Sequence, residues 1–365
     1  MSRSEVLPPL PGHGRFAYRG IHDRPDYVWP GGARLAVYLG FNIEHFAFGE
    51  GLGAALGPPS PEPDVLNYSW REYGNRVGVW RCLELFDALG LPSGTLINTA
   101  LYDHCPEVVA ACVARGDEII GHGHTNAVRQ ADLDVDAERA LLAACRERIA
   151  EASGCAPTGW LSPWISESRH TPDLLAETGY RYNLNWAHDD QPVRMRTAHG
   201  PLWSIPYPQE LNDIPMIVAR KLDGRDFADM IIDQFDEMLE QSARQPLVMG
   251  VALHPYLVGQ PYRLRHLRRA LEHCGRTRSG RHLVHDTGPD LRACRIAGAA
   301  GNAGRLVRVV AVERTCPRVG GPCIMNCLRQ EAGCRQPDGY CVCRSLPAPD
   351  DVSEAGLFDF LTENA

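Results

Sequence analysis

The sequence is nearly devoid of lysine, since Lys221 is the only one among 365 residues. Arginine carries almost all of the positive charge, and the formal net charge is -8. A nucleic-acid-binding surface needs a cationic footprint that displaces counterions from phosphates, so this balance argues against a nucleic-acid partner. We ascribe the preference for arginine to coding bias rather than to function.

Long apolar runs are absent too. No segment approaches the roughly 18–20 apolar residues that a membrane-spanning helix requires, so we expect no membrane partner. The N-terminal stretch MSRSEVLPPLPGHGR contains prolines where a secretory signal would have an uninterrupted apolar segment. These two absences predict a cytoplasmic protein.

Paired CxxC motifs are missing although the chain has 13 cysteines. Those between Cys82 and Cys274 are scattered, as small core residues are in a reducing compartment. The others crowd the C-terminal part of the chain, which differs in character from the rest.

Residues 276–365 form an atypical tail in which arginine, glycine and cysteine are abundant and no helical or strand period persists. Such a mixture is typical of GC-rich DNA translated in the wrong reading frame, so we expect a frame-shifted or unrelated, poorly ordered segment. The alternative is a small zinc or disulfide module, whose spacing lacks the paired motifs of common zinc sites. Its candidate cysteines are Cys316, Cys323, Cys327, Cys334, Cys341 and Cys343.

Between residues 34 and 275 the pattern alternates between strand and helix. Residues 34–44 form an apolar run that turns polar at its end, which is typical of a buried parallel strand. Further strands are predicted at 93–99, 117–124, 158–164, 180–186, 202–207 and 246–254. Helices are predicted at 71–90, 106–116, 134–154, 171–179, 225–243 and 263–274.

About seven such β/α units favour a closed or nearly closed barrel over an open doubly wound sheet. The glycine fingerprint that cradles a phosphate after the first strand of an open sheet is not found. We therefore predict an α/β fold, a deformed (β/α)7-type barrel at 34–275, preceded by an extension at 1–33.

Polar residues end five of the predicted strand regions. They are Asn42 with Glu44, His122 with His124 and Asn126, Ser162 followed by Pro163 and Trp164, Glu210 with Asn212 and Asp213, and His254. In a parallel barrel the active site gathers at the carboxyl ends of the strands. Carboxylates and imidazoles gathered at one mouth suit general acid–base hydrolysis.

These motifs and their order resemble the polysaccharide deacetylase superfamily (carbohydrate esterase 4, NodB homology). The shared features are an acidic first strand, a histidine-rich turn, a Pro-Trp segment, a late Asp-containing loop and a Leu-His-Pro near the end. The branch with cofactor-independent allantoinase and cyclic imide hydrolases matches best. The resemblance implies the NodB-homology fold, hydrolysis of non-peptide C–N bonds in a small amide, ureide or cyclic imide, and, for this branch, a homo-oligomer.

Three positions depart from the family pattern. Asn42-x-Glu44 replaces Asp-x-Asp, Asn126 replaces the second zinc-binding histidine, and Leu161 replaces the arginine before Pro-Trp. Glu44, His122 and His124 could still supply three zinc ligands, since alternate strand residues share a face. The branch that matches best works without metal, so we favour no cofactor and keep zinc as the alternative.

The resemblance and the residue types together predict a role for each side chain. We expect Glu44 to act as base on a water, His122 to stabilise the oxyanion, His254 to protonate the leaving nitrogen and Asp213 to orient His254. The predicted substrate-binding residues are Asn42, Asn126, Trp164, Asn212 and Glu210. Purely structural roles remain open for these residues. Above all, Glu44 could simply form an ion pair with an arginine.

Two other functions remain open at this point. One is a metal-dependent deacetylase of polysaccharides or N-acetyl sugars. The other is a catalytically inactive barrel that binds a ligand, which Asn42 and Asn126 keep under consideration.

Overall fold

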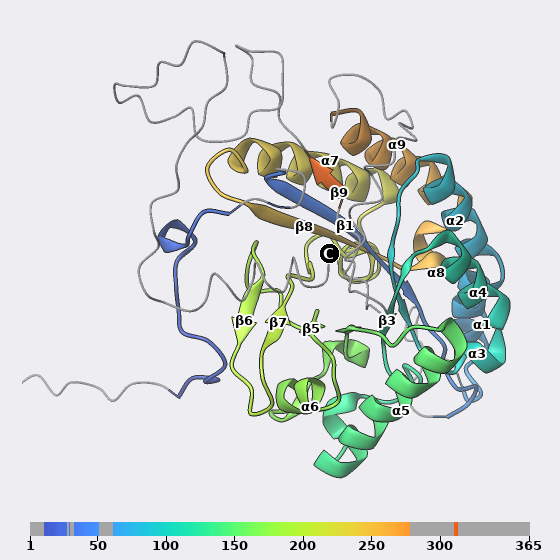
Figure 1. The fold of residues 1–365 in the computed structure, drawn as a ribbon. Helices are drawn as coiled ribbons and strands as arrows, with labels where there is room; N and C mark the ends of the chain where they lie inside the picture. The colour runs from blue at the N-terminus through green and yellow to red at the C-terminus, as the bar shows by residue number, and fades with distance from the viewer. Residues whose placement is uncertain (1–10, 28, 30–32, 51–60, 278–309, 313–365) are drawn as a thin grey trace, which may run out of the picture.

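A computed structural model describes residues 11–27, 29, 33–50, 61–277 and 310–312. One curled, largely parallel β-sheet forms its interior, with strand order β6-β7-β5-β4-β3-β2-β1-β8, and β9 pairs with β1 off this path (Figure 1). The strands are β1 (Leu35–Ile43), β2 (Gly94–Ile97), β3 (Glu118–Gly121), β4 (Gly159–Trp160), β5 (Tyr182–Asn183), β6 (Val193–Met195), β7 (Leu202–Ser204), β8 (Leu247–Leu253) and β9 (Val310–Val312).

The β1 strand is the longest of the sheet, and its nine residues are almost entirely buried. It pairs in parallel with β8 from Leu35 to Phe41 and with β2 from Gly40 to Ile43. An apolar run buried on both faces is what a parallel strand covered by helices requires. The predicted 34–44 strand is therefore confirmed.

Helices cover the outside of the curled sheet, with α7 and α9 over β1 and β8, α1 to α4 beside β3, and α5 and α6 near β5 (Figure 1). The longer helices are α1 (Val65–Tyr73), α2 (Val79–Ala88), α4 (Pro106–Arg115), α5 (Val135–Ser153), α6 (Thr171–Glu177), α7 (Gly224–Gln241) and α9 (Pro261–Thr277). The short ones are α3 (Leu101–His104) and α8 (Pro255–Val258), with π-helices η3 (Gly74–Gly78) and η6 (Ile214–Ala219). The apolar faces of α2 and α7 join one large core with β1 and β8.

The predicted fold class, a deformed α/β barrel, is confirmed. The sheet path ends at β6 and β8 without a ladder between them in the described chain, and a single bridge, Asn212 to Ala252, joins the β7–η6 connection to β8. The barrel is thus a curled sheet with an incomplete wall rather than a closed cylinder.

Three local features differ from the sequence pattern. The helix expected at 71–90 begins earlier, at Val65, and is interrupted by η3. Figure 1 and the strand register also show β6, which runs antiparallel to β7 and was not predicted. Three residues of the tail, Val310–Val312, pair with the start of β1, whereas the remaining tail predictions lie outside the described residues.

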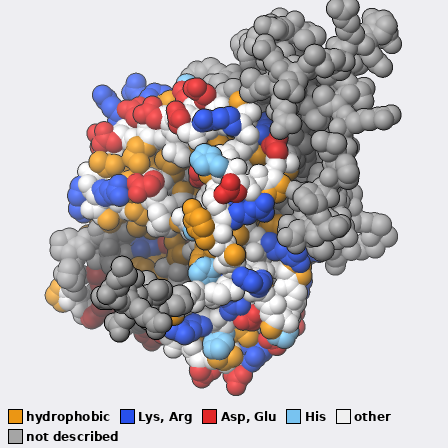
Figure 2. All heavy atoms as spheres, turned by 90° about the vertical axis from the view of Figure 1, so that its left-hand side faces the viewer, with side chains coloured by type: hydrophobic (Ala, Val, Ile, Leu, Met, Phe, Trp, Pro, Cys, Tyr) orange, Lys and Arg blue, Asp and Glu red, His pale blue; other side chains and the backbone are white. Residues whose placement is uncertain are grey.

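The described surface offers no strong single-sign field on the face drawn in Figure 2, where acidic and basic side chains are interspersed. No helix in the described part of the chain is both long enough and apolar enough to cross a membrane.

Candidate active site

Three predicted side chains meet at the carboxyl ends of neighbouring strands. Glu44 follows β1, His122 follows β3 and His254 follows β8. The Oε1 atom of Glu44 lies 3.6 Å from Nε2 of His122 and 3.7 Å from Nε2 of His254. All three residues are buried, with exposed fractions of 8%, 2% and 4%. The strand order alone brings them together, because β1 lies between β8 and the β2–β3 pair.

Glu44 is held by two donors from other elements. Arg71 of α1 forms an ion pair with Oε2, and the side-chain amide of Asn126 donates to Oε1 at 2.6 Å. The Arg71 guanidinium also lies 4.0 Å from the ring centre of Phe46 and 4.7 Å from that of Tyr256, so it is enclosed by aromatic faces.

The ionised form of Glu44 is strongly favoured. Burial raises the pKa of its carboxyl group, but the charge of Arg71, the contact with His122 and the charge of His254 outweigh burial and lower the pKa to about 2. Glu44 is therefore a fixed anion at neutral pH, and a weak proton acceptor.

His254 and Asp213 form a tightly coupled pair. Nδ1 of His254 lies 2.6 Å from Oδ1 of Asp213, and the His254 backbone N–H donates to Oδ2 at 2.7 Å. Asp213 is fully buried and lies just before η6. Because the carboxylate accepts, the proton of neutral His254 sits on Nδ1 and the Nε2 lone pair faces Glu44.

His122 has its tautomer fixed in a similar way. Its Nδ1 lies 2.7 Å from the carbonyl oxygen of Leu161, which can only accept a hydrogen bond. Nε2 of His122 is therefore the nitrogen that faces Oε1 of Glu44. Nε2 of His122, Nε2 of His254 and Oε1 of Glu44 thus converge on one point.

The residues present do not fit the zinc position of the deacetylase pattern. Asn98 donates through Nδ2 to Oδ1 of Asn126 at 2.9 Å, so flipping the Asn126 amide would set two NH2 groups against each other. Asn126 must then turn its nitrogen, which is no metal ligand, toward Glu44. Arg71 takes the other oxygen of Glu44. Donors thus surround the carboxylate where a metal ion would have to sit.

The expectation that His124 shares a face with His122 fails. Strand β3 ends at Gly121, and Gly123 has a φ of 71°, so strand alternation does not continue. His124 is exposed, and its Nδ1 lies 3.0 Å from the hydroxyl of Thr99. The structure does not bring His124 to Glu44.

The predicted substrate-binding residues lie at different distances from the buried cluster of Glu44, His122 and His254. Glu210 lies on the surface, with its side chain 67% exposed, and pairs with Arg220 at 3.0 Å. Asn212 accepts from the backbone N–H of Ile214 at 3.1 Å and so supports the start of η6. Asn42 donates to the hydroxyl of Tyr207 at 2.8 Å and is 1% exposed. Asn212 and Asn42 are thus bound within the protein, and Glu210 lies outside the buried cluster.

Trp164 stands at the rim of the cluster in an unusual backbone conformation. It is 38% exposed and has a φ of 62°, and the next residue, Ile165, has a φ of 54°. Its indole N–H donates to the backbone carbonyl of Asn126 at 2.8 Å. Bulky residues adopt positive φ at a cost and mostly at functional positions, so Trp164 is a candidate wall for a ligand.

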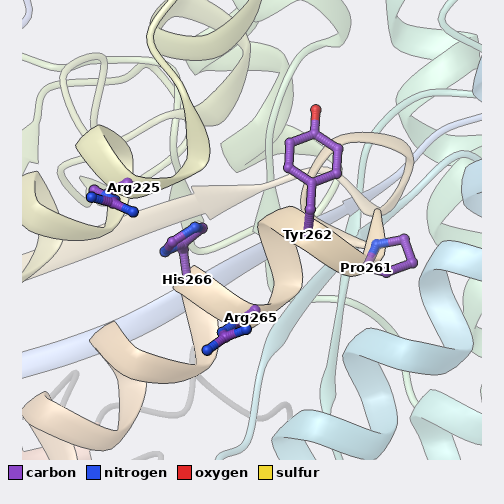
Figure 3. A pocket seen from close by; sticks show the side chains of 5 residues that line it. All are labelled: Arg225, Pro261, Tyr262, Arg265 and His266. Carbon is purple, nitrogen blue, oxygen red and sulfur yellow. The ribbon is translucent and has the colours of Figure 1, made fainter.

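A surface pocket of about 590 Å³ lies elsewhere, between the start of α7 and one face of α9 (Figure 3). It is lined by Arg225, Pro261, Tyr262, Arg265 and His266. It includes none of the residues predicted to act in catalysis.

Two important side chains were not predicted from the sequence. Arg71 lies in an amphipathic helix, where its spacing gives no sign of a partner just after β1. Asn98, directly after β2, accepts from the His45 backbone N–H at 2.7 Å and donates to Asn126. A search for polar residues after every strand would have found Asn98, but no local signal identifies Arg71.

Two proteins named as deacetylases are similar to this chain in sequence. The chain is 25% identical over 273 residues to a peptidoglycan deacetylase of Helicobacter pylori, covering 65% of this chain and 89% of the relative. A protein of Schizosaccharomyces pombe named as a polysaccharide deacetylase is 28% identical over 285 residues, covering 73% of this chain and 86% of the relative. No family model matches the chain.

Solved structures give a consistent picture. The PuuE allantoinase aligns with a TM-score of 0.62 at 29% identity, covering 68% of this chain and 87% of that one. The similarity predicted from the five motifs, to deacetylases and to an allantoinase-like branch, is therefore confirmed.

Proposed function

We propose that this chain, which shares the fold and motif order of the polysaccharide deacetylase superfamily, hydrolyses a non-peptide C–N bond in a small amide, ureide or cyclic imide. The observation that carries the proposal is the convergence of Glu44, His122 and His254 within 3.7 Å of one carboxylate oxygen. A water that donates to Oε1 of Glu44 and to Nε2 of His254 would be oriented for attack on a carbonyl carbon.

The division of roles differs from the sequence-based expectation. A general base works best when its pKa lies near the operating pH, whereas the surroundings of Glu44 lower its pKa to about 2. We assign the proton transfers to His254, which Asp213 orients through Nδ1. Glu44 then acts as a fixed negative charge that orients the water and stabilises the imidazolium of His254.

The reaction proceeds in two proton transfers. Nε2 of His254 accepts a proton as the water oxygen bonds to the carbonyl carbon, and the tetrahedral intermediate forms. The same proton passes to the nitrogen as the C–N bond breaks, giving a carboxylic acid and an amine or, from a ring, one opened product. Nε2 of His122, which lies 3.6 Å from Oε1 of Glu44, donates a hydrogen bond to the oxyanion when it carries a proton.

Trp164 and the peptide around Asn126 form the substrate wall in this proposal. The indole is partly exposed and fixed through Nε1, and the Arg129 guanidinium lies 5.7 Å from its ring centre, so the exposed part of the ring can contact a small planar ligand. A planar ureide or imide fits such a wall better than an extended polysaccharide, and the substrate class rests on this point.

The test is turnover by the purified full-length chain on cyclic imides, ureides and N-acetylated sugar oligomers. We expect hydrolysis of an imide or ureide, lost in His254→Gln and kept in His124→Gln, whose histidine is exposed and bonded to Thr99. Absence of turnover on every class would support the inactive ligand-binding barrel and overturn the proposal.

A metal-dependent deacetylase of acetylated sugars is the second candidate, favoured by the similarity to the Helicobacter pylori peptidoglycan deacetylase. Turnover confined to acetylated sugars and restored by added zinc would establish it in place of the first. The donors around Glu44 argue against this outcome.

A further inference from the structure

We propose that His45, Glu72 and His104 form a binding site for one divalent transition-metal ion, with zinc the best fit. The three residues come from separate elements: the segment after β1, helix α1 and helix α3. One ligand atom from each lies within 4.8 Å of the other two. This site is distinct from the Glu44 position, and it does not depend on the proposed reaction.

The spacing of the ligand atoms matches zinc. Tetrahedral zinc with bonds of about 2.0–2.1 Å sets its ligand atoms about 3.3 Å apart. Nε2 of His104 lies 3.0 Å from Oε1 of Glu72, and Nδ1 of His45 lies 3.9 Å from the same oxygen. The ligand atoms of His45 and His104 lie within 4.8 Å of each other, so the side chains would have to draw together around the ion to complete the geometry.

The decisive atom is Nδ1 of His45. It is buried and has no hydrogen-bond partner, although it faces the Glu72 carboxylate. Buried polar atoms in folded proteins are nearly always satisfied, so a simple hydrogen-bonded pair of Glu72 and His104 leaves His45 unexplained. A metal ion between the three side chains would satisfy Nδ1.

The backbone holds His45 in place for such a role. Its N–H donates to the side chain of Asn98 at 2.7 Å, and its carbonyl accepts from the Asn126 N–H at 3.0 Å and from the Thr125 hydroxyl at 2.8 Å. The ring of His45 lies 4.1 Å, centre to centre, from that of His104. The two imidazoles are therefore gathered before any ion binds.

The ligand types select the metal. Two imidazoles and one carboxylate suit zinc and its transition-metal neighbours, whereas magnesium and calcium prefer all-oxygen sets. Arg76 contacts the other carboxylate oxygen, Oε2 of Glu72, at 3.2 Å, which leaves Oε1 for the ion. Three protein ligands leave a fourth position for water.

The experiment uses the full-length chain after chelator treatment, titrated with zinc by calorimetry and with cobalt by visible absorption. We expect His104→Gln and Glu72→Gln to lose one equivalent of metal relative to the wild type, and His124→Gln to retain it. The tail contains cysteines, which could bind cobalt themselves. The difference spectrum between cobalt-loaded wild type and His104→Gln must therefore show ligand-field bands and no thiolate-to-cobalt charge-transfer band.

Equal stoichiometry in wild type and His104→Gln would overturn the proposal, and loss of metal in His124→Gln would place the ion elsewhere. Folding is checked by circular dichroism of each variant. The zinc-dependent rise in Tm must be present in wild type and absent from His104→Gln, because an ion that binds only the folded state stabilises it.

Discussion

The guanidinium of Arg71 pairs with the carboxylate of Glu44 where both side chains are 7% exposed. The pair joins helix α1 to the segment that follows strand β1. It explains why an acid can remain ionised among buried aromatic rings, and it occupies Oε2 of the carboxylate.

Replacing Arg71 by Gln should destabilise the protein by about 3–5 kcal/mol, because a buried carboxylate loses its partner. Chemical denaturation measures the change. The double variant Arg71→Gln, Glu44→Gln should recover part of the loss, since no unpaired charge remains. Equal losses in the single and double variants would show that the ion pair does not account for the effect.

Glu44 should contribute stability that disappears in acid. Its pKa is lowered from 4.5 to about 2 in the folded chain, so the folded state binds fewer protons than the unfolded state between these values. The contribution, on the order of 3 kcal/mol, is therefore present above pH 4.5 and is lost as pH falls toward 2.

Urea denaturation at several acidic pH values tests this point. The stability difference between wild type and Glu44→Gln should shrink as pH falls through the window. Glu210→Gln is the control, because its exposed pair with Arg220 contributes little at any pH. A pH-independent difference for Glu44→Gln would contradict the assignment.

Asp213→Asn should lower kcat about a hundredfold or more, because the amide no longer fixes the Nδ1 proton of His254. Nitrogen NMR of the imidazole should show a changed tautomer. The matched control is Asp229→Asn, an exposed carboxylate on α7 that pairs with Arg269 at 2.6 Å. An unchanged tautomer with lost activity would point to another role for Asp213.

Gly123→Ala should destabilise the chain and impair turnover. A Cβ there would lie 2.5 Å from Cγ of Pro163, and the φ of 71° already disfavours alanine. Gly154→Ala is the control variant. Gly154 has a φ of 72° and nothing within 4 Å of its Cβ position, so its loss of stability measures the backbone strain alone. We expect Gly123→Ala to cost about 1–3 kcal/mol more than Gly154→Ala in thermal or chemical unfolding.

Trp164→Ala should raise KM more than it lowers kcat if the indole serves as a substrate wall. Trp164→Gly should raise KM similarly but lose less stability, because glycine accepts the φ of 62° without strain. Steady-state kinetics and thermal unfolding of both variants decide the matter. A kcat loss with unchanged KM would remove Trp164 from substrate binding.

The order of strands and helices could be predicted because each element depends on a local pattern. The apolar run at 34–44 and the helical spacing at 225–243 both correspond to observed elements, β1 and α7. Predictions failed where the backbone departs from regular geometry. The positive φ of Gly123 turns His124 away from His122. The alternation of side chains along a strand does not predict that turn.

Sequence alone determined that a carboxylate and two imidazoles follow strands of one sheet, because the apolar pattern marks where the strands lie. The carboxyl ends of parallel strands lie at the same edge of the sheet, so these side chains were expected on one side of it. Tertiary structure decided what these groups can do. Arg71 lies 27 residues from Glu44 in the chain yet controls its ionisation, because charges act across a few ångströms of space, whatever their separation in sequence.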